Sequence, residues 1–255
     1  MGVLVEQKGP VVQITLNRPE VLNAMDPQTY EEIGEALVAL EHDPEVRVGI
    51  ITGAGDKAFT AGADINRMHD AAERRVSWEP WRPNRFDQGL NTSKPLIAAI
   101  NGYALGGGLE LALACDIRIA ASHAQFGTPE VKWNLLHGYG ALRLPQSIPL
   151  SNVMEMLLTG DFIDAQEALR LGLVSRVVSA EELLPAAYRT AQKICDNGPL
   201  AVQMTKELVL RGLNSSLEDA LRLYKAYNQI IGSTEDQREG TLAFAQKRKP
   251  VFQGK

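Results

Sequence analysis

Two short runs of apolar residues place the strongest constraint on the fold. Residues 96–100 (LIAAI) and 117–120 (IRIA) are almost entirely apolar, whereas residues 11–16 (VVQITL) alternate apolar and polar side chains with a period of two. The alternation is typical of a strand with one buried face. The continuous apolar run is typical of a strand that is buried on both faces in a parallel sheet. With a further strand expected at residues 46–51, the pattern predicts an α/β fold whose sheet is covered by helices.

Helix signals lie between these strands. Asp26 and Pro27 supply an N-cap and a first-turn proline for a helix expected at residues 28–40. Residues 109–116 (LELALACD) are expected to form a buried helix directly after three glycines. The recurrence of strand and helix predicts ββα or βαβ units in the first two thirds of the chain.

The last third of the chain is expected to be helical. Apolar residues recur at three and four positions over residues 199–214 and 217–231. Gly172 is expected to end the first helix of this region. Capping-box patterns predict helix starts at Asp164, Ser179, Ser215 and Thr234.

Composition and charge exclude several classes of function. The 255 residues carry a formal net charge of −5, whereas a nucleic-acid-binding surface needs a basic stripe. No run reaches the roughly 18 apolar residues of a membrane helix, and the first ten residues lack a signal-peptide pattern. Cys115 and Cys195 have no metal-site spacing and the four histidines no HExxH or HxH pattern. We therefore expect reduced, buried thiols, no metal and a cytoplasmic location.

Two glutamates stand out because each follows a glycine-bearing turn in an apolar segment. Glu110 ends the sequence NGYALGGGLE, and Glu130 ends the sequence AQFGTPE. A pair of carboxylates in an apolar site can hold and activate a water molecule. Taken singly, Glu110 could pair with Arg118 or Arg143, and Glu130 could be a cap or a surface residue. Taken together, the two glutamates favour a catalytic pair.

Glycines beside these glutamates could supply backbone donors. Gly106, Gly107 and Gly108 follow an expected strand and precede an expected helix. Unsatisfied N–H groups at a helix N-terminus suit a developing oxyanion, and glycine lets a ligand approach them. A tight turn alone would need one glycine rather than three. The small-residue turn at residues 59–64 (FTAGAD) is a second candidate source of such amides.

Residues 53–58 (GAGDKA) also fit the GxGxxA fingerprint of dinucleotide-binding proteins. A short fingerprint of this kind is weak evidence, because no amphipathic helix is expected directly after it. An NAD-dependent oxidoreductase is therefore an alternative from another class, although it would lack the acidic ribose partner at the end of a second strand.

Taken in order, the motifs resemble those of the enoyl-CoA hydratase/isomerase, or crotonase, superfamily over nearly the whole chain. The matching segments include LNRP at 16–19, AFTAGADI at 58–65, KPLIAAINGYALGGG at 94–108 and LLTG at 157–160. The resemblance implies an α/β crotonase-like (ClpP/crotonase) spiral of ββα units over residues 1–195. A helical C-terminal trimerisation region over residues 196–255 would oligomerise and cover the active site, giving a homotrimer or homohexamer.

The resemblance also implies the chemistry of the site. The substrate would be an acyl-CoA thioester, with no metal or redox cofactor. Glu110 and Glu130 match the two catalytic glutamates of the hydratases, which hold one water between them, with Glu130 as the donor to C2. The amides of Ala63 and Gly107 would form the oxyanion hole. Lys247 falls where a neighbouring subunit reaches the CoA phosphates. The remaining substrate-binding positions implied in this way are Glu20, Val21, Leu22, Ala61, Asp64, Ile65, Gly106 and Gly138.

The chain departs from the family pattern after the second glutamate. Where hydratases usually read GxxPGxGG, residues 134–141 read NLLHGYGA, so His137 replaces the proline and Tyr139 lies between two glycines. If both side chains point into the acyl pocket, the pocket is reshaped; if they point away, it is ordinary. Glu20 stands where the family often has lysine, which weakens one CoA contact.

The motifs favour a lyase of fatty acid metabolism that adds water syn across the 2,3 double bond of an unsaturated acyl-CoA. A double-bond isomerase of the same superfamily is the nearest alternative, because it can move a proton with a single glutamate. A non-catalytic interaction protein is another alternative, and the presence of both glutamates argues against it. Residues 65–92, with Trp78 and Trp81, are expected to form either a substrate-facing lid or a flexible excursion.

Overall fold

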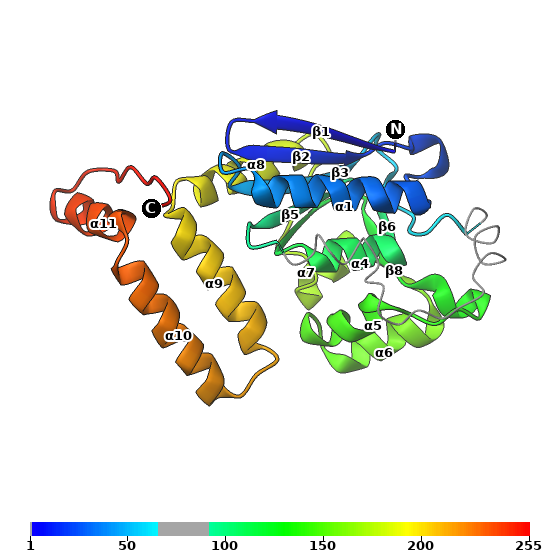
Figure 1. The fold of residues 1–255 in the computed structure, drawn as a ribbon. Helices are drawn as coiled ribbons and strands as arrows, with labels where there is room; N and C mark the ends of the chain where they lie inside the picture. The colour runs from blue at the N-terminus through cyan, green and yellow to red at the C-terminus, as the bar shows by residue number, and fades with distance from the viewer. Residues whose placement is uncertain (1, 66–91) are drawn as a thin grey trace.

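The computed structural model describes residues 2–65 and 92–255, which form two β-sheets with helices packed around them (Figure 1). The larger sheet has the strand order β1-β2-β3-β5-β7-β10. The first pair is antiparallel and the other neighbours are parallel. The bounds of its strands are β1 Val3–Lys8, β2 Val11–Leu16, β3 Val48–Gly53, β5 Leu96–Ile100, β7 Ile117–Ala121 and β10 Arg176–Val178.

The central strands of this sheet are buried on both faces, as their apolar runs predict. Every residue of β3 and β5 is buried, because α1 (Pro27–His42) and α8 (Leu183–Cys195) contribute to two separate apolar clusters on either side. β2 is more buried than its alternating pattern predicts. Its polar Gln13 is satisfied internally, accepting a hydrogen bond from the Tyr188 hydroxyl at 2.9 Å.

The smaller sheet carries the turns that lead to the two glutamates. Its strand order is β4-β6-β8-β9, with β9 antiparallel to β8. β6 runs into α4, which bears Glu110, and β8 runs into the 3-10 helix η2, which bears Glu130. The bounds are β4 Ala58–Thr60, β6 Tyr103–Leu105, α4 Gly107–Ala114, β8 Gln125–Gly127, η2 Pro129–Trp133 and β9 Phe162–Asp164.

Most expected helix starts are confirmed. Asp26 caps α1 by accepting a hydrogen bond from the Thr29 amide, and Asp164 and Thr234 cap α7 and α11 in the same way. Gly172 ends α7 with φ +83°. The remaining helical elements are η1 Pro19–Val21, α5 Tyr139–Arg143, η3 Leu144–Gln146, α6 Leu150–Thr159, α7 Ala165–Leu171, α9 Pro199–Gly212, α10 Leu217–Gly232 and α11 Glu235–Ala245.

Three expectations about local structure differ from the observed bounds, and one strand was not expected. Ser179 starts a turn rather than a helix, because α8 begins only at Leu183. Ser216, and not Ser215, caps α10 by accepting from the Asp219 amide. The strand expected from residue 46 begins at Val48, and β1 was not expected at all, because its side chains outside Val3 are exposed and lack an apolar pattern.

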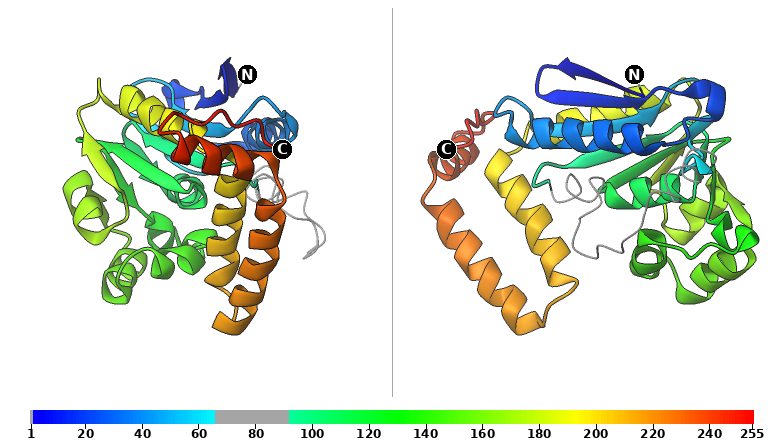
Figure 2. Two further views of the ribbon diagram at one scale, coloured as in Figure 1. Left: turned by 90° about the vertical axis from the view of Figure 1, so that its left-hand side faces the viewer. Right: turned by 45° about the vertical axis from the view of Figure 1, so that its right-hand side comes forward.

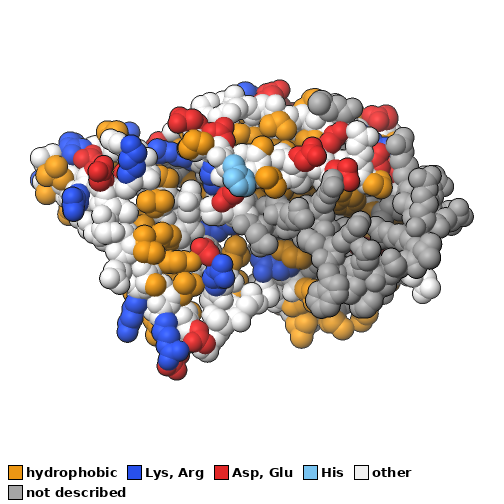
Figure 3. Space-filling view, in the orientation of Figure 1, with side chains coloured by type: hydrophobic (Ala, Val, Ile, Leu, Met, Phe, Trp, Pro, Cys, Tyr) orange, Lys and Arg blue, Asp and Glu red, His pale blue; other side chains and the backbone are white. Residues whose placement is uncertain are grey.

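The helices α9 and α10 form a hairpin, here called the arm, that projects from the sheets (Figure 2). Neither helix has a buried residue. Apolar side chains gather on its surface (Figure 3), including Val209, Leu213, Leu217, Leu221, Tyr224 and Ile230, which are 47–77% exposed. Midway along α9, Lys206 forms an ion pair with Asp116 at 2.8 Å and donates to the Lys94 carbonyl at 2.9 Å.

Both cysteines are buried and unpaired. Burial raises the pKa of the Cys115 thiol to about 12, with a smaller contribution from Asp116. Among the described helices, none is long and apolar enough to cross a membrane. The expected lid or excursion with Trp78 and Trp81 lies outside the described residues, apart from Ile65 and Thr92 at its two ends.

Candidate active site

Glu110 lies in the first turn of α4, on a helix whose other side chains form the core. Its neighbours Leu109 and Leu111 are fully buried, which fixes the rotation of the helix and turns Glu110 to the remaining side. Glu110 Oε1 accepts a hydrogen bond from the Gly140 amide at 2.8 Å. The guanidinium groups of Arg118 and Arg143 donate to other groups, Arg118 to the carbonyls of Cys115 and Leu173 and Arg143 to the Gln146 side chain. The interpretation of Glu110 as a partner of either arginine is therefore not supported.

Glu130 lies on η2, and its two carboxylate oxygens have different surroundings. Oε1 lies against Gly106, 3.2 Å from the point where a β-carbon on that residue would stand. Oε2 lies 3.2 Å from Nδ1 of His137. The Glu130 side chain is 18% exposed, so the interpretation as a surface residue is wrong.

One short segment brings the two carboxylates together. His137 contacts Glu130, while the next residues on the same segment, Gly138 and Gly140, contact Glu110. A β-carbon on Gly138 would stand 3.2 Å from Glu110 Oε1. On the other side, the Gly106 carbonyl accepts from the Glu110 amide at 3.1 Å while its α-carbon faces Glu130. Both glutamates therefore flank the same glycine turn.

The two amides expected to form an oxyanion hole lie close together. A β-carbon built on Gly107 would stand 3.7 Å from the Ala63 amide nitrogen and 3.0 Å from the Tyr30 hydroxyl. Gly107 is the first residue of α4, where an amide has no carbonyl partner within its own helix. Burial raises the pKa of the Tyr30 hydroxyl, and the charge of Glu110 raises it further. Tyr30 therefore remains a neutral hydroxyl beside these amides.

The turn that carries Ala63 is fixed to the segment before α1. The Met25 amide donates to the Gly62 carbonyl at 2.8 Å, and the Asp64 amide donates to the Met25 carbonyl at 2.9 Å. Ala61 is tied to the same segment, because its amide donates to the Leu22 carbonyl at 3.0 Å. These bonds set the position of the Ala63 amide from both sides.

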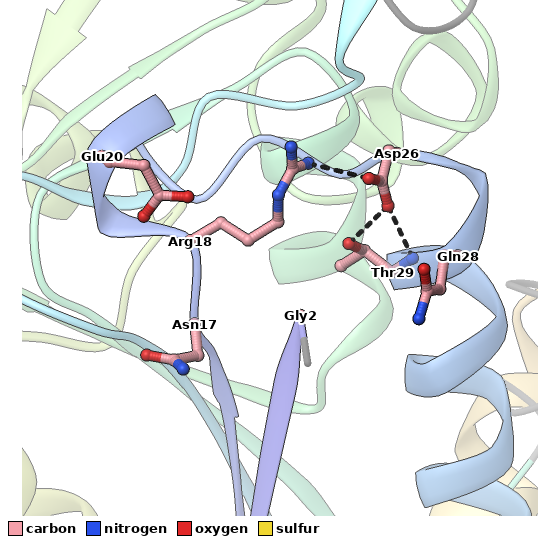
Figure 4. Close-up of a pocket in the computed structure, with 7 residues that line it drawn as sticks. All are labelled: Gly2, Asn17, Arg18, Glu20, Asp26, Gln28 and Thr29. Carbon is pink, nitrogen blue, oxygen red and sulfur yellow. Dashed lines mark hydrogen bonds and ion pairs between the residues drawn. The ribbon is translucent and has the colours of Figure 1, made fainter.

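Arg18 adds a charged brace to this arrangement. Its guanidinium forms ion pairs with Asp64 at 3.1 Å and with Asp26 at 3.4 Å. Figure 4 shows Arg18 reaching Asp26, which at the same time caps α1 through Thr29. All three charged side chains are at most 14% exposed. Asp64, expected to contact substrate, is thus held by Arg18.

Two buried asparagines hold the loop that was compared with a dinucleotide fingerprint. The side-chain amide of Asn23 donates to the backbone carbonyls of Ala54 and Ala58. The side-chain amide of Asn101 donates to the backbone carbonyls of Gly53, Gly55 and Ala58. The loop leads into strand β4 and not into a helix. A dinucleotide site needs a helix N-terminus at this point, so the NAD-dependent alternative is not supported.

The expected CoA-contacting residues lie on an exposed segment. Glu20 and Val21 belong to η1 and are exposed, and Leu22 follows with φ +55°. A hollow of about 300 Å³ opens beside them, and its lining includes Glu20, Arg18 and Asn17 (Figure 4). Ile65 is 55% exposed. Lys247 comes two residues after the end of α11, and α11 lies on the opposite side of the molecule from α5 and α6 (Figure 1). The role of Lys247 toward a neighbouring subunit stays a prediction.

Comparison with known proteins shows the family of this chain. The sequence model of the enoyl-CoA hydratase/isomerase family matches residues 6–255. The chain belongs to the enoyl-CoA hydratase/isomerase family. It is 42% identical to an (E)-benzylidenesuccinyl-CoA hydratase from Thauera aromatica, over 100% of both chains.

Other members of the family are nearly as similar. The chain is 40% identical to a short-chain-enoyl-CoA hydratase from Clostridium acetobutylicum, covering 97% of this chain and 96% of that one. A crystal structure of an enoyl-CoA hydratase subunit from Geobacillus kaustophilus superposes with a TM-score of 0.92 at 40% identity, over 100% of this chain and 99% of that one. The crotonase-type α/β fold is thereby confirmed.

Four residues of this site were not assigned a role from the sequence. Arg18 and Asn23 lie within matched motifs, but their contacts depend on segments distant in the chain. The only sequence feature that distinguishes Asn101 is that a glycine follows it, and this does not predict a role. Tyr30 lies on the expected first helix, and only the packing of α1 against α4 brings it to the glycine turn.

Proposed function

We propose that this protein is an enoyl-CoA hydratase that adds water syn across the 2,3 double bond of an unsaturated acyl-CoA. The observation that carries the proposal is the segment 137–140, which contacts both carboxylates and holds them around the Gly106 turn. Two partly buried carboxylates held on one glycine turn suit a single bound water. A binding module without chemistry would have no need for this arrangement.

The thioester carbonyl would accept hydrogen bonds from the amides of Ala63 and Gly107. These donors are fixed by the backbone before the substrate arrives, so they stabilise the enolate oxygen without reorganisation. Each such donor contributes about 3 kcal/mol to the transition state in comparable sites. The CoA part of the substrate would run along η1, where Glu20, Val21 and Leu22 are accessible.

The proton transfers would divide between the glutamates. Glu110, held at Oε1 by the Gly140 amide, would take a proton from water as the water oxygen forms its bond to C3. The π electrons move onto the thioester as an enolate, and Glu130 then gives a proton to C2. The proton on Glu110 returns to Glu130 through the next water, so one water is consumed in each turnover. Gly138 would help to place that water. These steps need no cofactor beyond the CoA of the substrate.

A spectrophotometric assay separates hydration from isomerisation. Hydration of a 2-enoyl-CoA removes the conjugated thioester absorbance, whereas isomerisation of a 3-enoyl-CoA creates it. We expect a loss of absorbance with 2-enoyl-CoA substrates and no comparable rate with 3-enoyl-CoA. A rise with 3-enoyl-CoA and no change with 2-enoyl-CoA would replace the proposed hydratase by an isomerase.

The acyl group is tested with the same assay. The relatives named above are a benzylidenesuccinyl-CoA hydratase and a short-chain-enoyl-CoA hydratase at nearly equal identity. We therefore propose a panel of crotonyl-, decenoyl-, cinnamoyl- and benzylidenesuccinyl-CoA. His137 turns toward Glu130 and the Leu157 carbonyl, and Tyr139 packs against the core. This arrangement favours an ordinary pocket over one narrowed by the His137 side chain.

A further inference from the structure

His137 stands where hydratases of this type usually have proline, and its imidazole is almost fully enclosed. The side chain is 9% exposed. Its Nε2 lies 2.9 Å from the Leu157 carbonyl oxygen on α6, and its Nδ1 lies 3.2 Å from Glu130 Oε2. Among the described residues, neither Nδ1 nor Oε2 has a hydrogen-bond partner, although both atoms are buried and lie within ion-pair distance of one another.

The contacts of Nε2 with the Leu157 carbonyl and of Nδ1 with Glu130 constrain which atoms of the imidazole carry hydrogens. A carbonyl oxygen only accepts, so Nε2 must carry a hydrogen. In a neutral imidazole Nδ1 then carries a lone pair, which would face the lone pairs of a Glu130 carboxylate in a site closed to solvent. Such a contact is repulsive. A proton between Nδ1 and Oε2, on the imidazole or on the carboxyl group, would remove this repulsion.

This contact also distinguishes the two oxygens of Glu130. Oε2 is held by His137, while Oε1 faces the Gly106 turn, where the substrate would bind. We propose that His137 is a positioning residue that holds Oε2 of Glu130 through a shared proton, so that Oε1 is the oxygen that carries a second proton and gives it to C2 of the substrate. This inference rests on the proposed function for the identity of C2, but the shared proton itself does not.

The length of the Nδ1–Oε2 contact is consistent with an enzyme that has no substrate bound. The separation of 3.2 Å exceeds the roughly 2.7–2.9 Å usual for a charge-assisted hydrogen bond. Catalytic hydrogen bonds are often long in ligand-free enzymes and shorten when substrate binds. Within residues 2–65 and 92–255, the titratable and charged groups on His137's own segment and on the elements around it are Glu110, Glu130, Lys132, Tyr139, Arg143 and Glu155. Of the described residues, Glu130 forms the ion pair with the imidazole, while Lys132 pairs with Asp161.

Two substitutions divide the functions of the imidazole. The amide nitrogen of His137→Gln reaches the position of Nε2, so this variant keeps the Leu157 contact and loses the Glu130 contact. The amide nitrogen of His137→Asn occupies the position of Nδ1, so it can still donate to Oε2. His42 is an exposed histidine on α1 that bonds to its own helix, which makes His42→Gln the matched control.

We expect His137→Gln to lower kcat by at least about tenfold, with KM little changed. This is less than the 10²–10⁴ that positioned proton transfer contributes, because Glu130 itself remains. His137→Asn should recover most of kcat, with a pH profile displaced from that of the wild type, because an amide does not titrate. His42→Gln should match the wild type in both. Wild-type kcat in His137→Gln would overturn the proposal. Equal losses in both variants with an unchanged pH profile would also overturn it, since packing alone would explain them.

The shared proton has a readout that needs no turnover. In ¹⁵N-histidine-labelled, ligand-free protein we expect a strongly downfield imidazole N–H proton. It should disappear in His137→Gln and in Glu130→Gln and persist in His42→Gln. Its absence from the wild type would refute the shared proton. If the signal is present but no enoyl-CoA is hydrated, the proposed function fails and the His137–Glu130 pair stands.

Discussion

Replacing Gly107 by proline tests the oxyanion hole directly, because the proposed donor is a backbone amide that no ordinary side-chain exchange removes. Gly107 is the first residue of α4, a position where proline is tolerated because its missing N–H has no partner within the helix. The substitution therefore deletes the donor while the helix can still form. Gly107→Ala is the matched control, since it adds a β-carbon but keeps the amide.

The structure predicts the size of each effect. The added β-carbon would lie 3.0 Å from the Tyr30 hydroxyl and 3.5 Å from Met25 Cε. Both are ends of side chains that can shift, so we expect a loss of about 1–3 kcal/mol in stability from overpacking in either variant. Only proline also removes the oxyanion donor, which contributes about 10²–10³ to kcat. The ratio of kcat between the two variants should therefore fall in that range.

Circular dichroism melts and the enoyl-thioester absorbance assay would measure the two effects on the same samples. We expect both variants to be folded at 25 °C and only Gly107→Pro to be nearly inactive. A folded Gly107→Pro whose kcat lies within a few-fold of Gly107→Ala would show that this amide does not bind the thioester oxygen.

Four further predictions follow from the site and the surface. Glu110→Gln and Glu130→Gln should each lower kcat by at least 10²-fold while acyl-CoA still binds by calorimetry; near-normal hydration by either variant would contradict the paired mechanism. Sedimentation should show a trimer or a dimer of trimers, because the arm exposes apolar side chains; a stable, fully active monomer would exclude it. Tyr139→Ala should leave the ranking of crotonyl-, decenoyl- and cinnamoyl-CoA by kcat/KM unchanged, since this ring packs on the core; a changed ranking would place it in the acyl pocket. Hydrogen bonds from Arg248 and the Val251 amide lower the pKa of Glu239 to about 2 from its ordinary value of 4.5. This carboxylate therefore stabilises the fold above pH 4.5 and loses that effect as the pH falls through 2. The difference in free energy of unfolding between wild type and Glu239→Gln should therefore shrink between pH 4.5 and 2, which acid titrations would measure.

The sequence predicted the central layers and the two glutamates that the structure brings to one glycine turn, because their signals are local. The apolar run of β5, the Asp26 cap and the three glycines before α4 each act within a few residues. Ser179 failed as a helix start because a capping pattern has no effect where the following residues form a turn. β1 gave no signal, since its stability comes from pairing with β2 and not from an apolar face.

The side-chain contacts within the site could not be predicted from the sequence. His137 was recognised as a departure from the family pattern, but its orientation depends on α6, whose Leu157 carbonyl lies 20 residues further along. Arg18 holds Asp64 across 46 residues. Contacts of this kind are set by tertiary packing, which periodicity and motif spacing do not encode.

The exposed apolar surface of the arm has a consequence for how the protein is handled. If that surface is covered by other copies of the chain, the folded state is favoured by mass action, and the melting temperature rises with protein concentration. Kinetic assays run at nanomolar dilution would then report dissociation as well as chemistry. A substitution in the arm could imitate a catalytic defect without altering the glutamates, and only a dilution series would separate the two.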